Sequence, residues 1–243
     1  LDFYKDLNDI QRSFFDLAKK IPRGGALVCN AEDPHLSLLV RESFSDVFDY
    51  GEESISVKLL VPGEHNRNNA RAALAAARIL GVPEEVAVRS LAAFPGTWRR
   101  FEYRGAMKTG ALVYDDYAHN PHKVRAALAG AREAFPDKKI VVVFRPHLYS
   151  RTKLLLREFG ESFNDADQVI VADIYAAREP HDETIHARDL VQEIQKSQQN
   201  ASYIPDFPSI EKELKEKTNK DTLVMLVGAG DIYDMGELLT EQE

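Results

Sequence analysis

The 243-residue sequence contains a single cysteine and no long apolar segment. Cys29 has no partner for an internal disulfide, and its setting in Ala26-Leu27-Val28-Cys29 predicts a small buried side chain on a strand. No run of about 18 apolar residues occurs, and the amino terminus lacks a signal-peptide pattern. Nothing indicates an oxidising compartment, and we expect a cytoplasmic protein.

Motifs of several enzyme classes are also absent. The sequence has no Gly-x-x-x-x-Gly-Lys-Ser/Thr phosphate loop, no Cys/His spacing for a metal and no Gly-x-Ser-x-Gly turn. A formal net charge of −8 argues against a nucleic-acid or membrane partner, although it leaves room for a local basic pocket. With 44% hydrophobic and 29% charged residues, the composition is ordinary for a globular protein of one or two domains.

Two domains are expected, 1–97 and 98–243, because the pattern of elements changes near Pro95-Gly96-Thr97. The first mixes helices with short strands. Helices are predicted near 5–20, 35–42, 68–80 and 83–94, and strands near 26–29, 47–50 and 55–60.

Strands and helices alternate in the second domain. Strands are predicted at 111–114, 140–144, 169–172, 202–204 and 223–227, and helices at 121–134, 153–163, 187–198, 209–217 and 232–239. The unbroken apolar run of 140–144 is typical of a strand buried on both faces. We therefore expect an α/β fold whose second domain is a Rossmann-like, doubly wound parallel sheet, preceded by a partial α/β domain.

The most informative segment is Asp115-Asp116-Tyr117-Ala118-His119-Asn120-Pro121. It follows a predicted strand and precedes a predicted helix, which is the edge of an open α/β sheet where ligands bind. A buried carboxylate without a partner is costly, so two acids at this position favour a site. A surface turn with a helix cap is the alternative.

Two polar clusters lie before this segment. His65, Asn66 and Asn69 come just before the alanine-rich helix, where Asn amides suit an adenine edge but are also common caps. Arg99 and Arg100 stand near the domain boundary, where a pair of arginines can clamp phosphate or form surface salt bridges.

Two further clusters follow it. Arg145, His147 and Arg151 come after the 140–144 strand and would form an anion pocket for an amino-acid carboxylate, although each alone could be plain surface. Gly228-Ala229-Gly230 lacks the third glycine and the distal acid of a dinucleotide site, so a tight turn is the better interpretation.

In order and spacing these segments resemble the Mur ligases. The matching segments are His65-Asn66-x-x-Asn69, Gly96-Thr97-x-Arg99-Arg100-Phe101, 115–121, Pro146-His147-x-Tyr149-Ser150-Arg151-Thr152, Tyr175-Ala176-Ala177 and Gly228-Ala229-Gly230-Asp231-Ile232. The fourth of them is most similar to the branch that joins L-alanine to UDP-N-acetylmuramate in peptidoglycan precursor synthesis.

The resemblance implies an ATP- and Mg²⁺-dependent ligase that forms an amide bond through an acyl phosphate. It implies that His65, Asn66 and Asn69 contact adenine. Arg100, more than Arg99, would contact the phosphates, and Asp116 would hold the ribose or orient the closing domain. The alanine pocket would consist of Tyr117, His119, His147 and Arg151. Arg100, Asp116 and His119 would be catalytic, since a histidine pKa near neutrality suits removal of a proton from the ammonium group. Loops of both domains would then share one cleft.

The resemblance covers the second half of the family's central ATPase domain and its carboxyl-terminal domain. In the family, the phosphate loop, a metal-binding Glu and an Asp-His pair precede the position of Leu1, so ATP and Mg²⁺ would be held mainly by residues outside these 243. We therefore expect negligible ligase activity from residues 1–243 alone. Leu148 stands where some members carry Arg, and Asn120 where this branch commonly has His.

A half-domain also raises a question of partners. It would expose a sheet edge and an apolar face, to be covered by further residues, by a second copy in a homodimer, or through a different fold. Two other functions stay open. One is a non-catalytic nucleotide- or amino-acid-binding module, and the other is a ligase for a recycled murein tripeptide, against which the Pro-His-x-Tyr-Ser-Arg-Thr segment argues.

Overall fold

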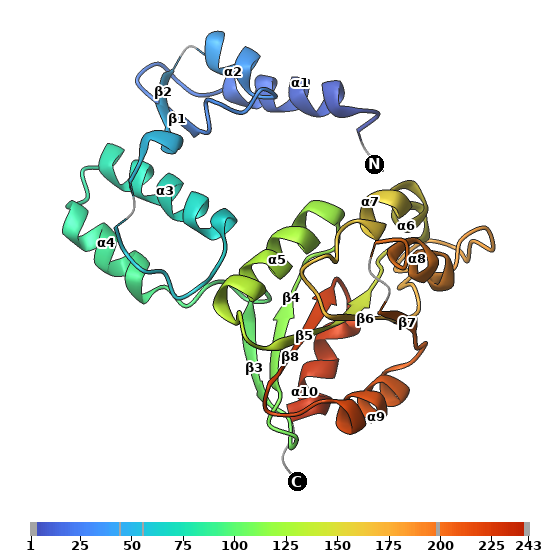
Figure 1. Cartoon of the computed structure of the whole chain (residues 1–243). Helices are drawn as coiled ribbons and strands as arrows, with labels where there is room; N and C mark the ends of the chain where they lie inside the picture. Colours follow the sequence, from blue (N-terminus) through green and yellow to red (C-terminus); the bar gives the residue numbers. More distant parts are fainter. Residues whose placement is uncertain (1–3, 44, 55, 198–199, 241–243) are drawn as a thin grey trace. The chain divides into compact units, whose positions relative to one another are not determined.

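The structure is a computed structural model that describes residues 4–43, 45–54, 56–197 and 200–240. The chain divides into two compact units, Leu1–Pro95 and Gly96–Glu243, which we call unit 1 and unit 2. The division falls within the predicted boundary segment Pro95-Gly96-Thr97. Figure 1 labels the helices and strands of both units.

Unit 1 combines a small parallel sheet with helices. Its elements are α1 (Leu7–Ala18), β1 (Ala26–Cys29), α2 (Ser37–Arg41), β2 (Asp46–Asp49), η1 (Tyr50–Glu52), α3 (Glu64–Ile79) and α4 (Glu84–Ala93). Strands β1 and β2 pair in parallel, and Cys29 is buried at the end of β1, as predicted. The strand predicted near 55–60 is wrong for residues 56–60, because no described strand pairs with them, and residue 55 lies outside the described residues.

The His65–Asn69 cluster lies inside a helix and not before one. α3 begins at Glu64, four residues earlier than predicted, with Gly63 as its N-cap at a φ of 96° that favours glycine. The asparagines are therefore not caps. Asn66 instead donates from Nδ2 to the carbonyl of Pro62 at 2.7 Å, while His65 and Asn69 are exposed.

An apolar face of unit 1 is uncovered in this chain. Helix α1 buries no residue, and Leu7, Phe14 and Leu17 are each more than half exposed. Phe14 and Leu39 line a hollow of about 350 Å³ beside this helix. The expected exposed apolar face is thus present, and its cover, including a homodimer, stays a prediction.

Unit 2 is built on a six-stranded sheet in the order β3-β4-β8-β5-β6-β7. Only β3 runs antiparallel to its neighbour, so the predicted mostly parallel α/β fold is confirmed. The strands are β3 (Glu102–Ala106), β4 (Leu112–Asp116), β5 (Lys139–Arg145), β6 (Gln168–Val171), β7 (Ala201–Tyr203) and β8 (Thr222–Gly228). The helices are α5 (Pro121–Ala134), α6 (Tyr149–Leu154), α7 (Leu156–Gly160), α8 (Ala187–Ile194), α9 (Phe207–Lys217), η2 (Asp231–Tyr233) and α10 (Asp234–Thr240).

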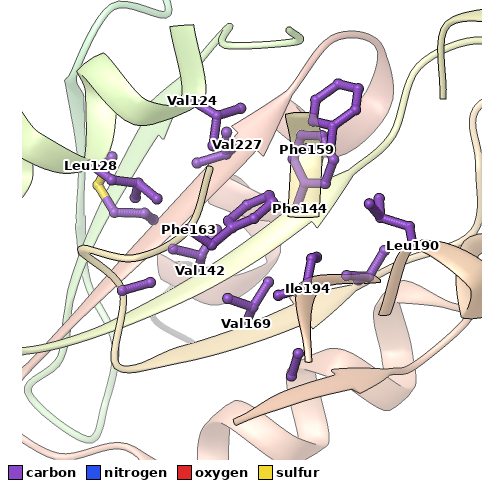
Figure 2. Packing of buried hydrophobic residues seen from close by; sticks show 14 of the residues in the cluster. Val124, Leu128, Val142, Phe144, Phe159, Phe163, Val169, Leu190, Ile194 and Val227 are labelled. Carbon is purple, nitrogen blue, oxygen red and sulfur yellow. The ribbon is translucent and has the colours of Figure 1, made fainter. Parts of the chain in front are cut away.

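Helices cover both faces of this sheet. On one face, Val124 and Leu128 of α5 and Leu190 of α8 pack with Phe144 and its neighbours, as Figure 2 shows. On the other face, residues of α9 and α10 pack against Val143 and the alternate residues of the central strands. The two cores fix the sheet edge that carries the polar loops. Among the described residues, no helix combines the length and apolarity needed to cross a membrane.

Two elements differ from the predictions. The edge strand β3 was not predicted. The charges of Glu102 and Arg104 suit an edge strand, but they interrupt the apolar pattern by which a strand is recognised in a sequence. The helix predicted at 153–163 is two short helices, α6 and α7, that are interrupted at Leu155. Gln198, at the predicted end of α8, lies outside the described residues.

Candidate active site

The two acids of the Asp115–Asp116 pair face opposite sides of the sheet. Successive residues of a strand alternate between faces, so Asp115 lies on the face of Val113 and Asp116 on the face of Tyr114. Both carboxylates are buried, with 0% and 5% of the residue exposed. Each therefore needs a different set of partners within the fold.

Asp115 is paired with Arg99 inside unit 2. Arg99 donates from Nε to Asp115 Oδ2 at 2.8 Å and from Nη2 to Oδ1 at 3.3 Å, in a bidentate arrangement. The same guanidinium donates to the carbonyls of Gly228 and Gly230 at 2.8 and 3.0 Å. Burial raises the pKa of Asp115, and Arg99 opposes that shift. Asp115 and Arg99 are thus used inside the fold, which agrees with the preference for Arg100 at the phosphates.

The loop around Arg100 is held at both sides. The carbonyl of Arg99 accepts from the Tyr117 N–H at 2.8 Å, and Phe101 donates its N–H to Asp116 Oδ2 at 3.0 Å. The Phe101 ring packs on Tyr114 with a centroid distance of 4.7 Å. Arg99 and Phe101 have φ angles of 55° and 49°, which are strained for residues other than glycine. Arg100 is exposed between them, and its side chain has no hydrogen bond or ion pair among the described residues.

Asp116 is an acceptor for backbone groups of two loops. Besides Phe101, the N–H of Ala118 donates to its carboxylate. Burial raises the pKa of Asp116 to about 6, against these hydrogen bonds and the charge of Arg100. The predicted ribose and catalytic roles of Asp116 stay predictions, and its contacts here position the loops that carry Arg100 and His119.

His119 presents an unprotonated nitrogen. Its Nδ1 lies 2.8 Å from the carbonyl oxygen of Tyr117, which only accepts, so Nδ1 carries the hydrogen and Nε2 is the acceptor. Burial, and then Lys123, Arg151 and His147, lower the pKa of His119 to about 4. The expectation of a pKa near neutrality is therefore wrong for His119 in this state, because burial disfavours the charged imidazolium and the neighbouring cations add to that effect.

His147 has the opposite tautomer. Arg151, which only donates, lies with Nη1 3.3 Å from His147 Nδ1, so the hydrogen of the neutral ring is on Nε2. Burial and the charge of Arg151 lower the pKa of His147. The ring stacks on Tyr175 at a centroid distance of 5.6 Å. His119 thus offers an acceptor at Nε2 and His147 a donor at Nε2. The two rings are near each other, because His147 acts on the pKa of His119.

The segments that carry His147 and Tyr175 are joined and strained. Leu148 donates its N–H to the Tyr175 carbonyl at 2.9 Å, and Glu179 accepts from the Ser150 N–H at 3.1 Å. Leu148 and Ala177 have φ angles of 73° and 52°. With Arg99 and Phe101, they are the non-glycine residues of the described chain with positive φ. Backbone strain of this kind concentrates at functional sites, and here it lies in the loops that carry the predicted site residues.

Sequence reasoning missed Lys123, which lies in the first turn of α5. Its N–H donates to Asn120 Oδ1 at 3.0 Å, so the helix cap fixes its backbone. Burial, and then the charges of Arg100 and Arg151, lower the pKa of Lys123, while Asp116 opposes them. A lysine one turn into a helix is ordinary in a sequence, and only the nearness of the arginines from other loops distinguishes it.

Arg145 does not belong to the predicted anion pocket. It lies on the opposite face of β5 from Phe144, where its Nε is 3.0 Å from Asp231 Oδ1 and its guanidinium lies 4.9 Å from the Phe207 ring centroid. The ion pair neutralises its charge, which leaves His147 and Arg151 of that cluster. Gly228 is the last residue of β8, and the predicted turn is a bend at Ala229 and Gly230. A Cβ at Gly228 would lie 2.6 Å from the Arg145 carbonyl oxygen.

The candidate site of unit 2 therefore comprises Tyr117, His119, His147 and Arg151, with Arg100, Asp116 and Lys123, and the roles of these residues stay predictions. His65, Asn66 and Asn69 belong to unit 1, and their adenine role stays a prediction. Within the described ranges, no group of three or more His, Cys, Asp or Glu residues could hold a metal ion, so no residue is assigned to Mg²⁺.

Comparisons with known proteins agree with this architecture. Residues 99–230 match the family model "Mur ligase, glutamate ligase domain". The UDP-N-acetylmuramate–L-alanine ligase of Caldanaerobacter subterraneus subsp. tengcongensis is 37% identical over 270 residues, which cover 100% of this chain and 58% of that protein. The enzyme of that name from Desulfitobacterium hafniense is 39% identical over 264 residues, covering 98% and 59%.

Solved structures give the same result. The UDP-N-acetylmuramate–alanine ligase of Thermotoga maritima superposes with a TM-score of 0.74 at 25% identity, covering 97% of this chain and 54% of that one. Mycobacterium tuberculosis folylpolyglutamate synthase shares the fold, with a TM-score of 0.70 at 14% identity and coverage of 97% and 59%. The chain belongs to the Mur ligase family, whose members are ATP-dependent amide ligases. It spans about 58% of the length of the curated relatives it matches.

The buried ion pair predicts a large stability difference between two neighbouring arginines. Arg99→Met leaves Asp115 buried without its partner, and we expect unit 2 to lose about 3–5 kcal/mol of unfolding free energy. Arg100→Met is the matched control and should change it by less than about 0.5 kcal/mol, because Arg100 is exposed. Hydrogen exchange of the slowest amides of β4 and β8 measures this free energy. Equal losses in the two variants would contradict the structural role of Arg99.

The cationic neighbours of the histidines predict the direction of a pKa change. Arg151→Met removes a positive charge that disfavours protonation of both rings, so the pKa values of His119 and His147 should rise. Arg157→Met, at an exposed position of α7, is the control and should change neither. NMR titration of the imidazole resonances measures both values. A pKa that does not rise in Arg151→Met would show that the charge of Arg151 does not disfavour protonation of that ring.

Proposed function

We propose that this chain acts in an ATP-dependent ligase that joins L-alanine to UDP-N-acetylmuramate, a step in cell-wall precursor synthesis. The similarity to proteins of that name supports the assignment, and the site in unit 2 suits an amino acid. The observation that carries the proposal is the pair of neutral histidines with opposite tautomers beside Arg151. Because the chain spans only part of its relatives, the activity and substrates of the whole protein belong to this proposal.

The site offers a partner for each end of L-alanine. Arg151 and the Nε2–H of His147 are donors that suit the carboxylate. His119 Nε2 is an acceptor that suits the amino group. Tyr117 lies against His119, with a ring centroid distance of 4.9 Å, and keeps that imidazole in place.

The chemistry follows the order that the family implies. ATP transfers its terminal phosphoryl group to the carboxylate of UDP-N-acetylmuramate, which gives an acyl phosphate and ADP. The amine nitrogen then bonds to the acyl carbon, the carbon–oxygen bond to phosphate breaks, and inorganic phosphate leaves. The nitrogen loses a proton in this step, and His119 Nε2 accepts it. Burial, and then repulsion by nearby cations, lower the pKa of His119; a bound carboxylate or phosphate lessens the repulsion, so an anion makes this ring a better base.

Arg100 is the residue of unit 2 that we assign to phosphate. Its exposed guanidinium lies 5.9 Å from the Tyr117 ring centroid, so it belongs to the same edge as His119. In unit 1, we assign His65, Asn66 and Asn69 to the adenine on the strength of the family resemblance alone. ATP binding by these residues and Mg²⁺ dependence are parts of the proposal, and we expect Mg²⁺ to be held mainly by residues outside this chain.

Ligand specificity tests the proposal on this chain. L-alanine should shift the amide and imidazole resonances of Tyr117, His119 and His147, whereas D-alanine should shift them far less, because the carboxylate and amine partners are fixed in space. Arg151→Ala should weaken L-alanine binding by about tenfold or more, while the control Arg157→Ala should not. If L-Ala-γ-D-Glu-meso-diaminopimelate shifts these resonances and L-alanine does not, the tripeptide ligase replaces the alanine ligase.

A turnover assay tests the expectation that ATP cleavage needs residues outside this chain. Residues 1–243 contain no phosphate loop, so the purified chain should release no phosphate from ATP in response to UDP-N-acetylmuramate and L-alanine together. Colorimetric phosphate detection measures this. Substrate-dependent release well above that of a heat-denatured sample would show that these residues suffice for ATP cleavage, against the proposal.

A further inference from the structure

Two arginines from separate segments of the chain act on Lys123 at the edge of the sheet. Arg100 follows Arg99 before β3, Lys123 lies in the first turn of α5, and Arg151 lies in α6. The charges of Arg100 and Arg151 both act on Lys123. Like charges brought together in a half-buried region repel, so the arrangement costs free energy unless an anion is present.

The fold supplies little negative charge to this group. Among the described residues, neither Lys123 nor Arg100 has a side-chain hydrogen bond or ion pair, and the Arg151 guanidinium donates to His147. Asp116 is the acid that acts on Lys123, but it is 5% exposed and accepts from the backbone of Phe101. Glu179 acts on Arg151, and its carboxylate accepts hydrogen bonds from Ser150. Among the described residues neither acid forms an ion pair with Arg100 or Lys123, so these two cations are the ones that lack a counter-ion.

The negative charge needed to neutralise these cations is supplied better by a phosphoryl group than by an amino acid alone. The carboxylate of L-alanine carries one negative charge, which Arg151 and His147 accommodate. This leaves Arg100 and Lys123 without a counter-ion. A phosphoryl group carries up to two negative charges and three acceptor oxygens, and lysine binds it as a point charge beside arginine.

The position of Lys123 is also fixed. Asn120 caps its backbone N–H, and Val124, the next residue, is fully buried in the core. A lysine held at its backbone and half-buried loses less side-chain freedom on binding than an exposed one. Lys123 is therefore suited to a defined ligand and not only to a general positive field.

We propose that Lys123 binds the transferred phosphoryl group, with its ammonium donating to a phosphate oxygen beside Arg100. The inference rests on the ligase proposed above and adds a phosphate-binding residue to it. The group has two sources, the terminal phosphate of the nucleotide and the acyl phosphate, and the chemistry that Lys123 recognises is the same in both.

Binding of acetyl phosphate, a small acyl phosphate, tests the inference on the 243-residue chain. Lys123→Met should weaken its affinity by about ten- to a hundredfold, since an ionic hydrogen bond is lost. Lys123→Arg should retain most of the affinity. Lys212→Met removes the same charge from an exposed position of α9 and should leave binding unchanged. Unchanged affinity in Lys123→Met would overturn the inference.

A second arm separates the two sources. The comparison ligand is a non-hydrolysable ATP analogue with a nitrogen bridge between its last two phosphates. If Lys123→Met lowers the affinity for acetyl phosphate but not for this analogue, Lys123 binds the phosphoryl group after its transfer. Loss of both affinities means that it meets the group on the nucleotide as well, and either result supports the inference. Loss of the analogue's affinity alone would contradict binding of the acyl phosphate.

Two measurements guard against a folding artefact and keep the two proposals separable. In the unaltered chain, acetyl phosphate should shift the side-chain ammonium resonance of Lys123 but not that of Lys212, and no shift of Lys123 would overturn the inference without any variant. If L-alanine fails to bind the unaltered chain while acetyl phosphate still binds through Lys123, the alanine assignment fails and the phosphate site stands.

Discussion

The buried ion pair between Arg99 and Asp115 is the interaction on which the polar edge of unit 2 depends. It joins the loop before β3 to the end of β4, and through Gly228 and Gly230 it also holds the end of β8. A charge buried in this way is stable only with its partner, so the loop has one position. Arg99 and Phe101 are held in strained backbone conformations as a result, and Arg100 between them faces solvent.

This constraint also determines the charge of the edge. Asp115 is neutralised by Arg99, Asp231 pairs with Arg145, and Asp116 faces inward with a raised pKa. Glu179 acts on Arg151, whereas Arg100 and Lys123 form no ion pair with a carboxylate among the described residues. Although the chain has a net charge of −8, Arg100, Lys123 and Arg151 form a local cationic group at this edge. The substrates of the proposed reaction are anions. Burial, and then the charges of Lys123 and Arg151, lower the pKa of His119 and keep its Nε2 unprotonated near neutral pH.

The sequence predicted the fold of unit 2 well because its central strands are unbroken apolar runs, as 140–144 illustrates, and because each is followed by a periodic helix. It predicted the site loops for a related reason, since polar residues that directly follow such strands must gather at one edge. β3 escaped prediction because its residues are charged and its pairing is antiparallel, and residues 56–60 were assigned to a strand on local propensity that no neighbouring strand supports.

Individual roles within the loops were less predictable, because they depend on which face each side chain occupies. Asp115 and Asp116 look alike in the sequence, but successive side chains of a strand lie on opposite faces of the sheet. Asp115 therefore pairs with Arg99, and Asp116 accepts from the backbone of Phe101. Arg145 and His147 were grouped together, although only His147 lies with Arg151. Lys123 carries no signal in the sequence, since its importance comes from charges on two distant loops.

The central claim is that the edge of unit 2 holds unpaired cations that receive an anion. A crystal structure of residues 1–243 grown with tungstate, a heavy phosphate analogue located by its anomalous scattering, tests it most directly. The account predicts one strong tungstate peak in contact with Arg100 and Lys123, with Arg99 still paired to Asp115. Tungstate bound elsewhere while Arg100 and Lys123 pair with carboxylates of their own chain would contradict it.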